Sequence, residues 1–133
     1  MSHEIDSTFD IDEDTTPDYT ATLRKKTNLD GTPGDPIPGS VLDSLVLTFY
    51  QEYTRAIINS RDRQNVLQLN GVTVNEAGLL TWTMTRADTA ILNDALRSEP
   101  HIALFEYTFP GVTGTEYAKH VVRFNVDNQV RVP

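Results

Sequence analysis

The chain has 133 residues, a formal net charge of −8 and no cysteine. The length suits one domain of ordinary size, and the lack of cysteine excludes disulfides, thiolate metal ligands and a cysteine nucleophile. No apolar stretch is long enough for a membrane span, and the first residues have neither the basic nor the apolar region of a signal peptide. We therefore expect a protein that is made in the cytoplasm, is not secreted and contacts no membrane.

Most of the excess negative charge lies in residues 1–18, which we call the acidic arm. The arm has no lysine or arginine and contains seven acidic residues, namely Glu4, Asp6, Asp10, Asp12, Glu13, Asp14 and Asp18. The remaining chain has twelve acidic and eleven basic residues, with no dense basic stripe, so nucleic acid is not an expected partner. The arm has too few large apolar residues to fold alone. It is either a solvated tail or a segment held by a basic surface of a neighbouring chain.

The first half of the body predicts strands separated by polar turns. Alternation in Leu42–Gln51 places Leu45, Leu47 and Phe49 on one face of a strand. The other expected elements, in chain order, are a strand at Tyr19–Arg24, a Pro/Gly-rich loop at Asn28–Gly39, a short strand or edge segment at Ala56–Ile58 and a polar turn at Arg61–Gln64.

The second half predicts two hairpins with a bridge between them. The first joins Val72–Val74 to Leu79–Thr85 through the turn Asn75–Gly78, and it directs Leu80, Trp82 and Met84 to the core. Arg86–Asn93 has no period of two and predicts one or two helical turns, with Ala90 and Ile91 or Leu92 facing inward. The last two strands are expected at Ile102–Phe109 and from about Tyr117 to Val126, where Val122, Phe124 and Val126 form the inner face.

Six or seven short strands at intervals of 8–12 residues are typical of a β-sandwich. The order of hairpin, bridging turn and hairpin favours an immunoglobulin-like arrangement. The sequence therefore predicts an all-β, immunoglobulin-like sandwich over residues 19–133, with a short helical turn and an extended acidic arm over residues 1–18.

The arm contains the segment Asp10-Ile-Asp-Glu-Asp14, which opens like a calcium-binding loop. Such a loop requires glycine at its sixth position and glutamate at its twelfth, but this sequence has Thr15 and Ala21 there. We therefore interpret the segment as a protein-binding surface. The residues expected to contact a partner are Phe9, Asp10, Ile11, Asp12, Glu13 and Asp14.

No pattern of catalytic or metal-binding residues accompanies the arm. The three histidines, His3, His101 and His120, lack the spacing of a zinc site, and there is no serine-nucleophile elbow or phosphate-binding loop. Asp88 and Glu106 are expected on the surface. The sequence predicts no cofactor and no enzymatic activity.

The body resembles small immunoglobulin-like proteins and domains of tailed bacteriophages and prophages. Its order of strands and turns is similar to that of the N-terminal domain of phage baseplate upper proteins. The segments that carry the resemblance are 45–50, 56–67, 78–92, 101–109 and the closing strand that ends at 128–133. The resemblance implies a structural virion component, such as an accessory decoration, neck, tail or baseplate protein. Its implied partners are capsid, neck or tail subunits, or other copies of itself, with the arm lying along a neighbouring subunit.

A second hypothesis is a carbohydrate- or receptor-binding sandwich that uses loops at one end. The candidate loops are Arg61–Gln64 and Thr113–Glu116. Neither loop contains an aromatic residue, whereas sugar sites usually present a flat ring, so this hypothesis ranks second. An enzyme ranks third.

Overall fold

The computed structural model describes residues 5–26, 28–93 and 95–128 of the chain. This part contains eight β-strands and one short 3-10 helix. In chain order the elements are β1 (Ser7–Asp12), β2 (Asp18–Thr22), η1 (Gly39–Val41), β3 (Ser44–Gln51), β4 (Gln64–Asn65), β5 (Val72–Val74), β6 (Leu79–Thr83), β7 (Ser98–Pro110) and β8 (Thr115–Asp127).

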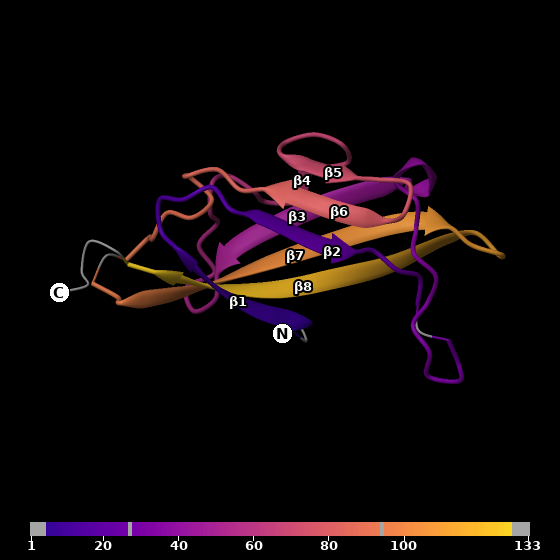
Figure 1. Cartoon of the computed structure of the whole chain (residues 1–133), viewed down its shortest axis with the longest axis horizontal. Coiled ribbons are helices and arrows are strands. Elements are labelled where there is room, and N and C mark those ends of the chain that lie inside the picture. Colours follow the sequence, from indigo (N-terminus) through magenta and orange to yellow (C-terminus); the bar gives the residue numbers. More distant parts are fainter. Residues whose placement is uncertain (1–4, 27, 94, 129–133) are drawn as a thin grey trace.

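The strands form two sheets that stack as two layers (Figure 1). The larger sheet has the order β1-β8-β7-β3-β4 and the smaller has the order β2-β6-β5. All neighbouring strands are antiparallel except β1 and β8, which are parallel. The predicted β-sandwich is therefore confirmed.

The core lies between the two sheets and is centred on Trp82, whose side chain is fully buried. Its ring meets Phe49, Phe105 and Phe124 edge-to-face, with centroids 5.1, 5.7 and 5.9 Å away. Aromatic pairs favour this geometry because the positive edge of one ring faces the negative face of the other. The inward residues predicted from alternation are buried, namely Leu45, Leu47, Phe49, Leu80, Trp82, Met84, Val122, Phe124 and Val126.

A second, smaller apolar cluster lies on the outer face of the larger sheet. It consists of Tyr50, Ile102, Leu104 and Val121, with Ile5 packed against it. Strand β7 is therefore buried on both faces over much of its length. The segment before β1 thus covers apolar surface of the body.

The turn between β5 and β6 has the chemistry that the sequence predicts. The Asn75 side chain accepts hydrogen bonds from the N–H groups of Ala77 and Leu79, both at 2.9 Å. Gly78 has φ +83°, a left-handed conformation that glycine adopts without steric cost. The register Val72↔Trp82 to Val74↔Leu80 confirms the hairpin.

The bridge between β6 and β7 differs from the prediction. Arg86–Thr89 forms a single hydrogen-bonded turn and not a helix, so the predicted helical turn is wrong. Ala90 and Leu92 are exposed, and only Ile91 packs against the core. Asp88 and Thr89 are the buried residues of this segment, because their polar groups have partners inside the protein. The one helical element of the described chain is η1, which begins at Gly39, the last residue of the predicted Pro/Gly-rich loop.

The acidic arm is part of the larger sheet in this structure. Residues 7–12 form β1, which pairs with Val122–Asp127 of β8 at the edge of the sheet (Figure 1). Residues 13–17 then lead to β2 in the other sheet. The arm therefore connects the two layers, and its transfer to a neighbouring chain stays a prediction.

Candidate functional site

Strand β1 presents two different faces because side chains alternate along a strand. Phe9 lies opposite Phe124 of β8 and turns toward the smaller sheet. Its ring stacks on Phe124 at 6.2 Å and meets the edge of Tyr19 at 5.5 Å. Phe9 still keeps 45% of its surface exposed. This half-exposed ring therefore holds β1 to the body and leaves part of its apolar surface in contact with solvent.

The other face of β1 is acidic. Asp10 and Asp12 lie opposite Asn125 and Asp127 of β8, and both aspartates of β1 are exposed. Asn125 donates a hydrogen bond to Asp10 at 3.3 Å. Negative side chains therefore gather where the end of β1 lies beside the end of β8. We call Asp10, Asp12, Glu13, Asp14 and Asp127 the acidic surface.

The end of β1 is fixed to the turn that follows β6. Both guanidinium nitrogens of Arg86 that contact Asp14 lie 2.6 Å from its carboxylate oxygens. The hydrogen bond from Arg86 lowers the pKa of Asp14, so this carboxylate is ionised at neutral pH. Thr89 donates to the Thr15 carbonyl at 2.9 Å and accepts from the Thr15 N–H at 3.0 Å. These contacts set the position of the acidic surface on the body.

The beginning of β1 is fixed by a polar chain from Asp6 to Tyr19. Asp6 donates its N–H to the Val121 carbonyl at 2.8 Å and accepts the Val121 N–H through its carboxylate at 2.7 Å. The same carboxylate lies 3.4 Å from Nδ1 of His120, whose Nε2 contacts the Tyr19 hydroxyl. Burial raises the pKa of Tyr19 and lowers that of His120. A neutral imidazole that accepts from Tyr19 and donates toward Asp6 therefore accounts for the geometry.

A cleft of about 280 Å³ opens between β1 and β2 on the side of the sandwich. Phe9, Tyr19, Met84 and Phe124 form its apolar part. Asp10 and Asp18 line it as well. An apolar side chain flanked by basic residues would match both the floor and the rim of this cleft.

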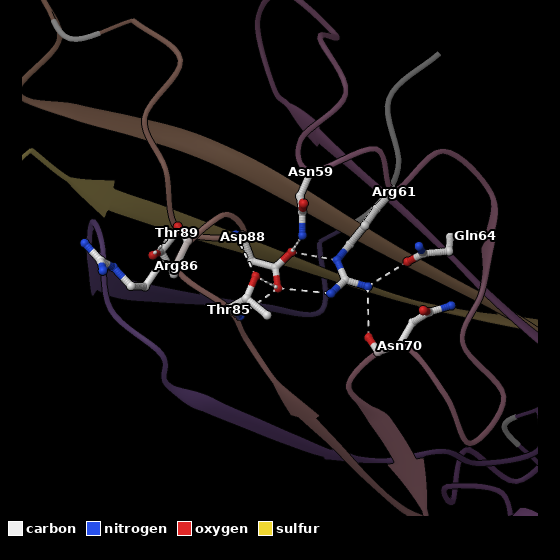
Figure 2. Close-up of polar contacts among 8 residues, drawn as sticks. All are labelled: Asn59, Arg61, Gln64, Asn70, Thr85, Arg86, Asp88 and Thr89. Carbon is white, nitrogen blue, oxygen red and sulfur yellow. Dashed lines mark hydrogen bonds and ion pairs between the residues drawn. The ribbon is translucent and has the colours of Figure 1, made fainter.

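A buried ion pair lies away from β1, between the loop after β3 and the turn after β6. Figure 2 shows Asp88 facing the guanidinium of Arg61, with Nε–Oδ1 and Nη2–Oδ2 distances of 2.6 and 3.0 Å. Asn59 and Thr85 also donate to the carboxylate. Arg61 donates further to the side chain of Gln64 and contacts the face of Trp82.

The burial of this pair corrects one sequence prediction. Asp88 was expected on the surface, but its side chain is 0% exposed and that of Arg61, in the predicted polar turn, is 4% exposed. Burial alone would raise the pKa of Asp88, and the hydrogen bonds from Arg61, Thr85 and Asn59 outweigh it, so the pKa lies below its usual value. Every charged atom of the pair has a partner from the protein. The pair therefore joins the loop after β3 to the turn after β6.

A second buried pair, Glu99 and His101, lies at the start of β7. His101 Nε2 is 2.6 Å from Glu99, and both side chains are fully buried. The N–H groups of Leu92 and Asn93 donate to the same carboxylate at 2.9 Å. Burial lowers the pKa of His101, while these hydrogen bonds overcome burial and lower that of Glu99. The pair thus joins the bridge before β7 to the sheet.

The two loops of the receptor-binding hypothesis both lie on the larger sheet. Gln64 belongs to β4 at the edge of this sheet and is in register with Leu47, which pairs with Phe105 of β7. Arg63 lies 3.3 Å from Glu106, and Glu106 accepts a hydrogen bond from Tyr117. Thr113–Glu116 belongs to the tip of the β7–β8 hairpin, beyond Phe109.

The described part of the chain comprises residues 5–26, 28–93 and 95–128. Within this part of the chain no three His, Asp or Glu side chains gather closely enough to hold a metal ion. None of its helices has the length and apolar character to span a bilayer. His3 lies outside the described residues.

No family model matches the chain, and the comparison with curated proteins finds no relative. The positions of the six residues predicted to contact a partner come from the structure. Phe9 to Asp12 lie together on β1, and Glu13 and Asp14 form the turn that follows. The sequence did not predict that these residues pair with β8. The alternation of Phe9 and Ile11 with Asp10 and Asp12 was the available signal for a strand.

Proposed function

We propose that this protein is a non-enzymatic structural component of a tailed-phage virion that binds neighbouring virion subunits through β1 and the acidic surface. An accessory decoration, neck, tail or baseplate position fits a sandwich of this size. The virion setting rests on the resemblance of the sequence to phage immunoglobulin-like proteins. The binding surface rests on the position and charge of β1.

We also assign the sandwich to the immunoglobulin-like class. With the strands lettered along the chain and β4 taken as C′, the larger sheet has the order A-G-F-C-C′ and the smaller has the order B-E-D. Immunoglobulin-like domains also place G, F and C in one sheet and B, E and D in the other, although their strand A lies beside B and here it lies beside G. This order supports the class and agrees with the resemblance.

The observation that carries the proposal is an acidic strand at the edge of the larger sheet. In the described chain, β1 pairs with a strand on one side only, so its other edge presents backbone donors and acceptors to a partner strand. Phe9 adds apolar area, and Asp10 and Asp12 add charge. Together these features suit a partner with a basic, partly apolar strand or groove.

The test is to look for the protein in purified phage particles of its source. Quantitative mass spectrometry and immunogold labelling should find it in many copies at one defined part of the particle. Its absence from particles that contain the other structural proteins would refute the virion assignment.

A further inference from the structure

A basic groove lies beside the start of β1, far from the acidic surface. It has a volume of about 560 Å³ and runs between the segment after β2 and the first half of β8. Four cationic side chains line it, namely Arg24, Lys25, Lys26 and Lys119. These include all three lysines of a chain whose net charge is −8. Asp6 is the one carboxylate among the lining residues.

Hydrogen bonds hold the backbone of Arg24 and Lys25 in place. Lys25 donates its N–H to the Asp35 carbonyl at 2.9 Å, and the hydroxyl of Tyr107 on β7 donates to the Arg24 carbonyl at 2.9 Å. The side chains of Arg24, Lys25 and Lys26 are exposed. The groove is thus a firm concave surface with positive charge at its rim, which suits an acidic protein surface.

The groove lies beside the first half of β8, whereas the acidic surface lies at the end of this strand. Lys119 and Asp127 are both on this strand, and their separation along it is about 27 Å at about 3.4 Å per residue. One molecule cannot bring the two surfaces together without unfolding β8. Two molecules placed head to tail can.

We infer that the acidic surface of one copy docks in the basic groove of the next copy. This inference rests on the proposed function and names its partner as a second copy of this chain. Because the two contacting surfaces differ, the contact is heterologous and produces either a ring or an open filament. The contact depends on exposed charges, so salt weakens it. The screening length is about 10 Å at 0.1 M salt and about 3 Å at 1 M.

The experiment is sedimentation velocity of the full chain over a range of concentrations, at low and at high salt. A groove variant carries Lys25→Glu and Lys26→Glu, and a surface variant carries Asp10→Lys and Asp12→Lys. A third chain combines all four substitutions. The control, Arg55→Glu with Arg63→Glu, changes the net charge as the groove variant does but lies outside the groove.

Each chain is first checked for the wild-type circular dichroism spectrum and unfolding midpoint. Lys25→Gln with Lys26→Gln serves as a milder groove change.

The wild-type protein and the control should self-associate at low salt and dissociate at high salt. The groove variant and the surface variant should each associate about tenfold more weakly or worse, because like charges then face each other. The combined chain should recover association, because its charges are exchanged and again complementary. A wild-type protein that stays monomeric at low salt, or a combined chain that does not recover, would overturn the inference. A monomeric protein that still requires Asp10 and Asp12 to enter particles would refute the self-contact alone and leave the proposed function intact.

Discussion

The buried pair of Arg61 and Asp88 gives a quantitative test of how loops close this sandwich. Asp88→Asn keeps the side-chain shape but removes the charge that faces a guanidinium only 4% exposed. Breaking a buried ion pair by removing one partner costs about 3–5 kcal/mol. For a domain of this size each kcal/mol lowers the unfolding midpoint by about 4 °C, so we expect a fall of about 12–20 °C. Thermal unfolding followed by circular dichroism measures it.

The matched control is the exposed pair of Arg86 and Asp14. This pair is also bidentate, but its side chains are 70% and 61% exposed. Arg86→Gln should leave the midpoint unchanged within error, because water and salt screen exposed pairs. The double variant Arg61→Met with Asp88→Asn should lose less stability than the sum of its single variants. An Asp88→Asn midpoint as high as that of the control would refute the reasoning.

Three further predictions concern titration and turn geometry. Burial holds the pKa of His101 and His120 below the ordinary 6.5. As the pH falls, the unfolded state therefore takes up protons before the folded state, and the free energy of unfolding should decrease below about pH 6.5. Urea unfolding at several pH values should show this decrease, and His120→Gln should make it smaller. Burial and the hydrogen bond to Glu106 raise the pKa of Tyr117 to about 12, and Glu106→Gln should lower it in an NMR titration, whereas an unchanged value would contradict that role. Gly78→Ala places a Cβ 3.0 Å from neighbouring backbone at φ +83° and should destabilise the protein by more than about 1 kcal/mol in urea unfolding; a neutral result would contradict the strain.

Strands with regular alternation could be predicted from the sequence. In β3 the period of two identifies Leu45, Leu47 and Phe49 as inward residues, and all three are fully buried. This prediction succeeds because the period of a strand is local and one face meets the core. The turn Asn75–Gly78 was predictable for the same reason, since its residues determine their own backbone conformation.

Features that depend on distant partners could not be predicted in this way. Arg61 and Asp88 are 27 residues apart, and each charge alone favours the surface. Strand β1 is short and acidic, and it is stable in the sheet because Phe9 packs on Phe124 and Tyr19. The acidic composition of the arm was evident from the sequence, but its place on β8 follows from tertiary contacts.

The proposed function requires that the acidic face of β1 bind neighbouring subunits. The most direct test compares copy number per purified particle for the wild-type protein and for Asp10→Asn with Asp12→Asn. The control is Asp43→Asn with Asp62→Asn, which removes the same charge from exposed positions before β3 and β4. We predict that the β1 variant keeps the wild-type unfolding midpoint but enters particles at about one tenth of the wild-type level or less, because two charge pairs at the interface are lost. Equal incorporation of the β1 variant and the control would contradict the account.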